Sequence, residues 1–519
     1  MWKLFPLLMA ACRLQGAEPY DVVVYGATAG GAIASIAAAR EGMRVALLEP
    51  GRHVGGVLTG GLGKTDMDRQ ENVIGGLARE FFERAGKHYG ERVAWRFEPS
   101  VAERILNDWL REAGVQVFFG QRLAGIRKKS GRIVELRTVG GKEFAAPVYI
   151  DSSYEGDLMK AAGVSYAVGR ESRSLYGESL AGRQDFLSGS HQFHAPVPAY
   201  GPDGKLLPYV QAQESLENIG EGGPKFQSYC FRICLTRNPD NRLPLPRPEG
   251  YDAARYRLAR AYLAALGDSA RLNDFLGISV LPNDKTDINS GGAVSTNLPG
   301  ASWEYPEAGY ERRQEIWREH LSWAQGLLYF LANDAAVPER LRKQMSEWGL
   351  AKDEFPDTGH WPHQLYVREG RRMLGQYVLT QKDLQSARHK EDSIGMGGYN
   401  IDIREVQWVA HDVYHFPKVA KEVFMEGYVS MPVEPYDLPY RALLPKRSQC
   451  ANLLVTSCIS ASSVAYASFR MEPQYMIAGN AAGVAAALAV RSKTPLAGVD
   501  VAALRRRLAA QNQILCLHR

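Results

Sequence analysis

Residues 25–31, "YGATAGG", combine the residue types that bind a pyrophosphate. Gly26 and Gly31 hold the first and last positions of a G-x-G-x-x-G pattern, and Thr28 replaces its middle glycine. An apolar run precedes the pattern and small residues at helical spacing follow it, which predicts a strand, a turn and a helix. In such a unit the glycines permit a tight turn and close helix packing, and the amides at the helix start face the phosphates. The pattern predicts a dinucleotide site in which Thr28 is tolerated through an altered approach or through its hydroxyl.

A carboxylate at the end of the next predicted strand strengthens this prediction. Glu49 lies 23 residues after Gly26. At that position a carboxylate can accept both hydroxyls of an adenosine ribose, and its charge would repel a 2′-phosphate. The alternative is an ordinary strand–helix–strand unit in which the glycines serve only packing.

Two further Gly-rich segments favour FAD over NAD. "GRHVGGVLTGGLG" begins two residues after Glu49 and holds six glycines in thirteen positions, where an NAD domain usually continues into its next helix. Backbone amides of such a segment can line the longer flavin. Near the C-terminus, Gly479 and Gly483 are expected at the start of a short Ala-rich helix, whose positive dipole end would lie near the flavin N1–C2=O region. The alternative for these two glycines is a G-x-x-x-G packing face.

The elements that must position these residues follow an α/β pattern from 20 to about 175. Strands are expected at 20–25, 44–49 and 115–120, helices at 30–42, 75–90 and 99–114, and a β-meander between 123 and 151. Residues 176–250 are loop-rich, helical patterns return at 251–276 and 308–350, and residues 440–490 return to a strand, a Gly turn and a helix.

Composition and missing motifs exclude several classes of protein. The chain of 519 residues is 45% hydrophobic, and its net charge of +5 comes from scattered residues, so it predicts a globular protein with no nucleic-acid partner. Six cysteines without C-x-x-C exclude a disulfide reductase and favour buried thiols. No second strand–Gly-turn–helix is present for NADPH, because "GMGGYN" follows charged residues, and no metal spacing of Cys and His is present.

The N-terminus predicts an export signal over residues 1–19. Lys3 precedes a short apolar run from Leu4 to Ala11, and cleavage is expected near Ala17. That run is too short to span a bilayer. The "LMAAC" ending at Cys12 resembles a bacterial lipoprotein cleavage site, which would leave a lipid anchor on Cys12. The expected location is therefore the periplasm or, through the lipid, the cell surface; a frayed cytosolic N-terminus is the alternative.

Several stretches together resemble one family. The chain is similar to the bacterial FAD-dependent oxidoreductases of glutathione-reductase-like fold, an often exported group described loosely as xanthan-lyase-like or fumarate-reductase-like. The resemblance runs from about 20 to 490 and rests on "DVVVYGATAGGAIASIAAAREGMRVALLEPGRHVGGVLTGGLG", "YIDSSYEGDLMKAAGVSYAVGRES", "LPNDKTDIN", "LYVREGRRMLGQYVLTQ", "GGYNID" and "SFRMEPQYMIAGNAAGVAAAL".

The resemblance implies non-covalent FAD held across both ends of the chain. It implies a Rossmann-type FAD-binding domain built from residues 20–175 and 386–495, an inserted α+β substrate domain at 176–385, and a C-terminal helix within 496–519. It places these residues on the cofactor side: Gly26, Ala29, Gly30, Gly31, Glu49, Gly55, Gly56, Gly61, Asp151, Gly156, Gly479 and Gly483. Asp151 can contact cofactor hydroxyls, or the segment after it can cap a helix through Ser152 or Ser153. Relatives often carry His where this chain has Ser463, which leaves that role missing or transferred.

Catalysis would need a base, because a flavin takes hydride at N5 from a CH–OH whose proton must leave. The candidate bases are His53, His88, His360, His363, His411 and His415. His360 and His363 are preferred because they share a predicted loop, and Arg368, Arg371 and Arg372 follow where they could hold a carboxylate or sugar oxygens. The alternative is surface histidines beside a basic helix.

Other polar residues are assigned to the pocket on weaker patterns. Arg470 could face flavin or substrate, or pair with Glu472. Asp284, Lys285 and Asp287 are expected at a pocket rim, and His53 lies in the flavin loop. The residues assigned to catalysis are His360, His363, Arg372 and Arg470.

The leading hypothesis is an exported FAD-dependent dehydrogenase or oxidase. It would act on a C–H bond of an alcohol, carbohydrate-like or carboxylated small molecule and pass electrons to an acceptor of unassigned identity: oxygen, a quinone or a protein. One alternative is a fumarate-reductase-type C=C reductase that uses Arg as proton donor, and another is a non-enzymatic surface protein that keeps FAD structurally. The sequence has no feature that fixes the oligomeric state.

Overall fold

A five-stranded parallel sheet organises one half of the computed structural model, which describes residues 18–185, 191–212, 216–412 and 421–517. Its strand order is β23-β8-β2-β3-β4. The strands are β2 (Val22–Tyr25), β3 (Val45–Glu49), β4 (Gln116–Phe119), β8 (Val148–Asp151) and β23 (Leu453–Val455). Apolar side chains fill β2, β8 and β23 almost without interruption because helices or a second layer cover both faces of this sheet. The strand β23 comes from the far end of the chain, so both ends build one sheet.

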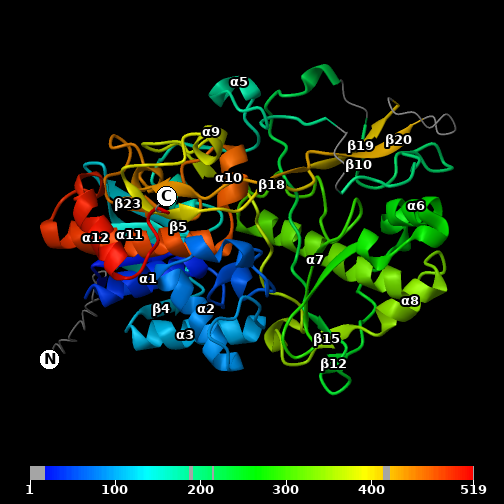
Figure 1. Cartoon of the computed structure of the whole chain (residues 1–519), viewed down its shortest axis with the longest axis horizontal. Coiled ribbons are helices and arrows are strands. Elements are labelled where there is room, and N and C mark those ends of the chain that lie inside the picture. The colour runs from blue at the N-terminus through cyan, green and yellow to red at the C-terminus, as the bar shows by residue number, and fades with distance from the viewer. Residues whose placement is uncertain (1–17, 186–190, 213–215, 413–420, 518–519) are drawn as a thin grey trace, which may run out of the picture.

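Two helices from opposite ends of the chain pack against each other on this sheet. They are α1 (Ala29–Arg40) and α11 (Glu472–Ser492), which lie side by side in blue and red in Figure 1. A Cβ added at Gly479 would lie 2.2 Å from Gly30 O, and one at Gly483 would lie 2.3 Å from Ala34 O. Only glycine permits this approach.

The prediction that Gly479 and Gly483 stand at the start of a helix is wrong. The helix α11 begins at Glu472, so both glycines lie in its interior and form the G-x-x-x-G packing face that was the alternative. The amides at the start of α11 belong to residues near Glu472 instead.

The rest of this half follows the predicted pattern closely. The helices α2 (Gly76–Tyr89) and α3 (Pro99–Glu112) occupy the expected ranges. The predicted meander is a four-stranded sheet of order β1-β7-β6-β5, made of β1 (Glu18–Pro19), β5 (Leu123–Lys129), β6 (Arg132–Thr138) and β7 (Glu143–Ala145). The short α4 (Asp157–Ala161) follows β8, and α12 (Val501–Ala510) is the helix expected near the C-terminus.

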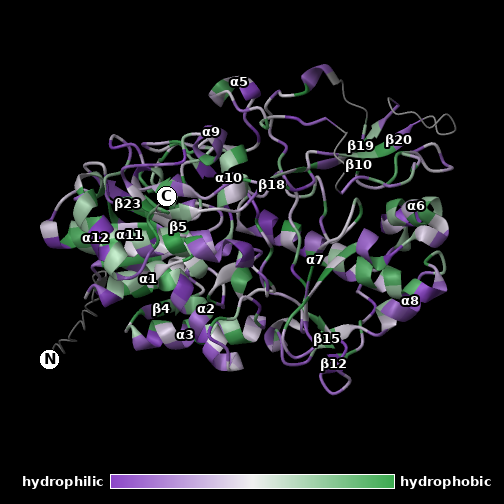
Figure 2. Cartoon of the chain, viewed as in Figure 1, coloured by the Kyte–Doolittle hydropathy of each residue, from purple (hydrophilic) through white to green (hydrophobic). Residues whose placement is uncertain are grey.

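The middle of the chain forms a second layer of helices and small sheets, shown in green at the right of Figure 1. Its helices are α6 (Arg257–Leu266), α7 (Tyr310–Asn333) and α8 (Glu339–Ser346). Residues 176–250 are poor in regular structure, as predicted. Hydrophobic residues concentrate on α1 and α11, whereas α7 and α8 alternate between polar and apolar faces (Figure 2).

Short strands and helices complete the middle and closing parts. The strands pair as β10-β19-β20, β11-β15-β12, β13-β14, β16-β9, β17-β22 and β18-β21. They are β9 (Tyr166–Ala167), β10 (Val210–Gln211), β11 (Leu235–Thr236), β12 (Arg242–Leu243), β13 (Leu276–Val280), β14 (Thr286–Ser290), β15 (Gly349–Ala351), β16 (Arg372–Met373), β17 (Ser393–Gly397), β18 (Ile401–Ile403), β19 (Gln407–His411), β20 (Glu422–Glu426), β21 (Val429–Met431) and β22 (Tyr436–Pro439). The short helices are α5 (Arg173–Tyr176), α9 (Gln381–Gln385) and α10 (Ser463–Phe469).

The cysteines agree with the expectation of buried thiols. Within the described ranges all cysteines are free, and Cys230, Cys234, Cys450 and Cys458 are buried. Cys12 and Ala17, on which the export predictions rest, lie outside the described residues. Among the helices that the structure describes, none combines the length and the apolar composition that crossing a bilayer requires.

The contact between α1 and α11 gives a stability test. Gly483→Ala places a methyl group 2.3 Å from Ala34 O, and the resulting overpacking should lower the free energy of unfolding by about 1–3 kcal/mol. Gly140→Ala is the matched control, because that exposed glycine has free space around its Cβ position. Urea unfolding of both variants measures the difference, and an equal stability of the two would contradict the packing role.

Candidate functional site

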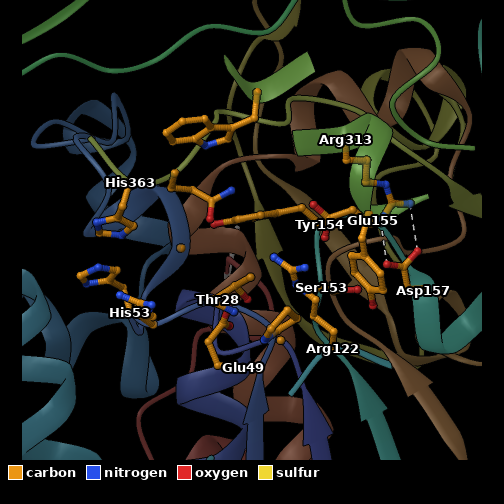
Figure 3. Close-up of a pocket in the computed structure, with 18 of the residues that line it drawn as sticks. Thr28, Glu49, His53, Arg122, Ser153, Tyr154, Glu155, Asp157, Arg313 and His363 are labelled. Carbon is orange, nitrogen blue, oxygen red and sulfur yellow. Dashed lines mark hydrogen bonds and ion pairs between the residues drawn. The ribbon is translucent and has the colours of Figure 1, made fainter. Parts of the chain in front are cut away.

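A cavity of about 230 Å³ opens where β2, β3 and β8 end, beside the start of α1. Figure 3 shows Thr28 and Glu49 on its lower wall and His53 and His363 one above the other at its side. We call it the cofactor cavity. The residues that line it are Tyr25, Gly26, Thr28, Glu49, Pro50, Gly51, Arg52, His53, Gly56, Arg122, Ser153, Tyr154, Glu155, Asp157, Tyr305, Tyr310, Arg313, Gln314, Trp317, His363 and Gln364.

The turn after β2 is held tightly against the end of β8. Gly26 has a φ of 92°, and a Cβ there would lie 2.6 Å from Ser153 N, so the turn requires glycine. The Thr28 hydroxyl accepts a hydrogen bond from Gly31 N at 3.2 Å and donates one to Ser152 O at 2.8 Å. Thr28 is therefore the N-cap of α1, and its hydroxyl is engaged within the turn.

The Glu49 carboxylate is positioned by backbone amides at the edge of this cavity. Its oxygens accept hydrogen bonds from Ala27 N at 2.8 Å and from Gly51 N at 2.6 Å. Burial raises the pKa of Glu49 to about 7, although these amide hydrogen bonds act in the opposite direction. A helix N-terminus, a glycine turn and a carboxylate at the next strand end, all on one cavity, fit the pyrophosphate and the ribose of a dinucleotide.

The other residues predicted on the cofactor side divide between the cavity and its supports. Gly56 lines the cavity, and Ala29, Gly30 and Gly31 form the first turn of α1. Gly55, Gly56, Gly61 and Gly156 all have positive φ angles. Asp151 is fully buried and accepts hydrogen bonds from Ser153 N, Ser153 Oγ and Met159 N, so Asp151 itself holds the first turn of α4, a role that the alternative had given to Ser152 or Ser153.

Two histidines stack at the wall of the cofactor cavity. The rings of His53 and His363 lie 3.8 Å apart and nearly parallel. The ring nitrogens of His53 lie 2.9 Å from Glu103 Oε1 and 3.0 Å from Asp357 Oδ2, and the carboxylate of Glu103 raises the pKa of His53. Burial lowers the pKa of His363 to about 3, so this ring is neutral. His363 thus reaches the cofactor cavity, as a partner of His53.

Several residues of this cavity were missed by sequence reasoning. Arg122 precedes β5, whereas Tyr310, Arg313 and Trp317 come from α7. Arg313 donates to both carboxylate oxygens of Asp157, at 2.6 and 3.0 Å, and so fastens α7 to α4. No local motif marks these positions, because they approach the cavity only through this packing.

A second cavity has a volume of about 480 Å³, and we call it the polar chamber. Residues 64–70, which directly follow the Gly-rich loop, form part of its wall. Seven cationic and three carboxylate side chains are among its lining residues, which are Lys64, Asp66, Asp68, Arg69, Gln70, Arg96, Arg232, Asn289, Tyr366, Arg368, Gly398, Tyr399, Asn400, Asp402, Arg404, Arg470 and Met471.

Arg470 is the residue predicted to be catalytic that lines this chamber. It donates to Asp402 Oδ2 at 2.7 Å and to Tyr366 Oη at 3.1 Å, so its ion pair is not with Glu472. Glu472 instead accepts a hydrogen bond from Tyr154 at 2.7 Å, and burial raises the pKa of Glu472 to about 8.

Of the three predicted rim residues, Asp284 is exposed and does not line the chamber, whereas Asp287 and Lys285 lie deeper than expected. Asp287 is fully buried and accepts two hydrogen bonds of 2.6 Å from Arg232, which lines the chamber. Lys285 is buried among Glu98, Asp353 and Glu354, at 2.6 to 2.9 Å, in a structural cluster.

His360 and Arg372 line neither of these two cavities. The His360 ring contacts the carbonyl of Glu354 at 3.0 Å. Arg372 is fully buried and donates to Glu171 at 2.6 Å and to Glu369, an environment that favours a structural ion pair over catalysis. Arg371 is similarly engaged with Asp157 and Glu307, both at 2.8 Å. Of the three neighbouring arginines, Arg368 is the one that reaches the polar chamber.

The remaining candidate bases lie away from both cavities or beyond the described chain. His88 lies beside Arg104, and His411 lies 3.6 Å from Asp412. His415 is outside the described residues.

Two segments connect the cofactor cavity with the polar chamber. The Gly-rich loop contributes Gly51 and Gly56 to the cofactor cavity, and Lys64, which directly follows the loop, lines the chamber. Residues 363–368 contribute Gln364 to the cofactor cavity, and Tyr366 and Arg368 to the chamber. A long cofactor that binds its phosphates at the Gly26 turn and extends along these segments would end near the chamber.

The Glu49 carboxylate gives a test of the cofactor site. Glu49→Gln should raise the Kd of FAD by about tenfold or more, because hydrogen bonds to a charged group contribute about 1.5–3 kcal/mol. In the unsubstituted protein, FAD affinity should also fall as the pH drops through about 7, where Glu49 becomes protonated and its charge is lost. Fluorescence titration of FAD into the cofactor-free protein measures both effects.

Glu143→Gln is the control, because Glu143 is an exposed residue of the meander. A Kd that is unchanged in Glu49→Gln, or the same pH dependence in that variant, would contradict the assignment.

A family model agrees with this geometry, and several solved structures are similar to parts or most of the chain. The family model "FAD dependent oxidoreductase" matches residues 21–508, which is nearly the whole chain. A geranylgeranyl bacteriochlorophyll reductase-like protein of Thermoplasma acidophilum is 12% identical, over 96% of this chain and 85% of that chain, with a TM-score of 0.37. Thioredoxin reductase of T. acidophilum is 21% identical, over 26% of this chain, with a TM-score of 0.18, and the match spans about a third (35%) of its length. The chain belongs to the FAD-dependent oxidoreductase family, and its cofactor is FAD.

Proposed function

We propose that this FAD-dependent oxidoreductase removes a hydride from a C–H bond of an alcohol, a carbohydrate-like compound or a carboxylated small molecule. The observation that carries the proposal is the pair of cavities to which residues 363–368 contribute, one fitted to a dinucleotide and the other walled by polar and charged side chains. FAD, when bound, supplies the hydride acceptor at N5 of its ring.

The polar chamber would bind and orient the substrate. Tyr366, Tyr399, Asn289 and Asn400 offer hydroxyl and amide groups, which suit the oxygens of a polyol or a sugar. The arginines add donors for anionic groups.

A carboxylate of the chamber would accept the hydroxyl proton, in the place of the histidines expected from sequence. Asp402 is engaged by Arg470 at 2.7 Å and lies 3.5 Å from Arg404. Asp66 pairs with Lys64 at 2.9 Å and its side chain is 31% exposed, so Asp66 is the better placed acceptor.

A C=C reductase of the fumarate-reductase type is the second candidate, favoured by the arginines of the chamber, one of which could donate a proton. Such a reductase would transfer a hydride from the reduced flavin to the substrate, the reverse of the dehydrogenase reaction. Its signature is anaerobic reoxidation of the reduced flavin by an unsaturated acid.

Export to the periplasm or the cell surface is a further part of the proposal. It is supported by the charged residue and apolar run at the start of the chain and by the "LMAAC" that ends at Cys12. Intact mass of the mature protein tests it: loss of the N-terminal residues, with or without a lipid on Cys12, is expected, and the full chain without modification would contradict it.

Spectroscopy of the purified protein tests the proposed reaction. A flavin absorbance band that is released on denaturation, and that is bleached under anaerobic conditions by one pool of sugars, polyols or hydroxy acids, is the expected result. A flavin that no pool bleaches, but that an unsaturated acid reoxidises after chemical reduction, would replace the dehydrogenase with the reductase. A flavin that responds to neither would favour a binding protein.

A further inference from the structure

Four arginines line the polar chamber with little exposure to solvent. Arg232, Arg368, Arg404 and Arg470 are 3%, 1%, 8% and 2% exposed. Three of them have carboxylate partners: Arg232 pairs with Asp287 at 2.6 Å, Arg470 pairs with Asp402 at 2.7 Å, and Arg404 lies 3.5 Å from Asp402 and 3.8 Å from Glu405. Across the part of the chain that the structure describes, no carboxylate pairs with Arg368.

Neutral acceptors fix the Arg368 side chain without balancing its charge. Its Nη1 donates to Ser228 O at 2.7 Å, and its Nη2 donates to Cys230 Sγ at 3.1 Å and to Asn289 Oδ1 at 3.2 Å. Buried charges in proteins are normally paired, because removing an ion from water is costly without a counter-charge. The Arg368 guanidinium is held in place by neutral groups and lines a cavity, so it can bind an anion there.

Other cations surround the same point. The guanidinium carbons of Arg368, Arg470 and Arg232 lie 4.8, 5.9 and 6.0 Å from the centre of the Tyr366 ring. Arg470 Nε is also buried and lacks a hydrogen-bond partner among the described residues. Like charges gathered around one ring repel each other, and an anion in the chamber would offset that repulsion.

With FAD bound at the Gly26 turn, its phosphates would not supply the counter-charge that Arg368 lacks. The Gly26 turn and Glu49 line the cofactor cavity, and the lining residues of the two cavities have no member in common. The chamber, at about 480 Å³, has room for a molecule of sugar size beside Arg368.

We propose that the polar chamber recognises its substrate through a carboxylate, with the guanidinium of Arg368 as the anchor. This inference rests on the proposed function, in which the polar chamber is the substrate site. A planar guanidinium matches the two oxygens of a carboxylate, and Lys64, Arg69 and Arg96 at the chamber add long-range attraction for an acid.

Calorimetric titration of the FAD-loaded protein, at constant ionic strength, tests this inference without turnover. The acidic probes are D-gluconate and D-glucuronate, their neutral counterparts are D-sorbitol and D-glucose, and D-glucose 6-phosphate is the phosphate probe. We expect at least one acid to bind and to raise the thermal unfolding midpoint, and its neutral counterpart to bind at least tenfold more weakly.

Substitutions assign the binding to Arg368. Arg368→Gln should raise the Kd of the acid at least tenfold. Arg368→Lys should raise it less, because lysine keeps the positive charge but lacks the paired N–H donors of the guanidinium. Arg127→Gln should leave binding unchanged, since Arg127 is an exposed residue of the meander, with a side chain that is 62% exposed. Flavin content and the unfolding midpoint without probe show whether each variant is folded.

Four results would overturn the proposal: no acid binds; only the phosphate binds; Arg368→Gln lowers the unfolding midpoint but keeps the full shift on adding acid; or acid binds only after FAD is removed. The last result would mean that FAD itself neutralises Arg368. Acid binding, together with a flavin that none of the pools bleaches, would instead reject the dehydrogenase reaction and leave the anion site intact.

Discussion

The close packing of α1 against α11 is the contact on which the architecture depends. Glycines at positions 30, 479 and 483 let the two helix backbones approach to a distance that any side chain would prevent. Since α1 follows β2 near the start of the chain and α11 comes from its last segment, this contact joins the two ends of the chain across the middle part. It also sets the position of Arg470 and Met471, which directly precede α11 and line the polar chamber. The apolar packing of α1 against α11 thereby places the charged Arg470 at the polar chamber.

The two cavities differ in how burial acts on charge. For three groups in or beside the cofactor cavity, burial suppresses ionisation: it raises the pKa of Glu49 to about 7 and of Glu472 to about 8, and lowers that of His363 to about 3. The polar chamber instead keeps guanidinium groups, which stay charged at any ordinary pH. The cofactor cavity thus combines groups that are neutral or close to titration with the Arg313–Asp157 ion pair, whereas the polar chamber carries an excess of fixed positive charge, which suits an anionic substrate.

Membership of the FAD-dependent oxidoreductase family assigns the cofactor and the type of chemistry. The substrate depends on side chains that this architecture allows to vary, since one fold supports many reactions. Here those side chains come from residues 64–70, which follow the Gly-rich loop, from β18 and its neighbours, and from residues 363–368. In the function proposed above, the polar chamber is therefore the part of the protein that would set substrate specificity.

The sequence by itself determined the parts of the protein that are encoded locally. The Gly26 turn, the first turn of α1 and the position of Glu49 could be predicted because strand, turn and helix are consecutive, and the meander followed from its period-2 pattern. The tertiary structure alone decided which of Arg368, Arg371 and Arg372 faces a cavity. The three are neighbours in sequence, and their roles are set by carboxylates 64 to 214 residues away, such as Glu307 and Asp157, which engage Arg371 but leave Arg368 without a counter-charge. Likewise, His363 reached the cofactor cavity by stacking on His53, and α7 supplied residues that no local pattern marks, because contacts between distant segments are fixed only when the chain packs.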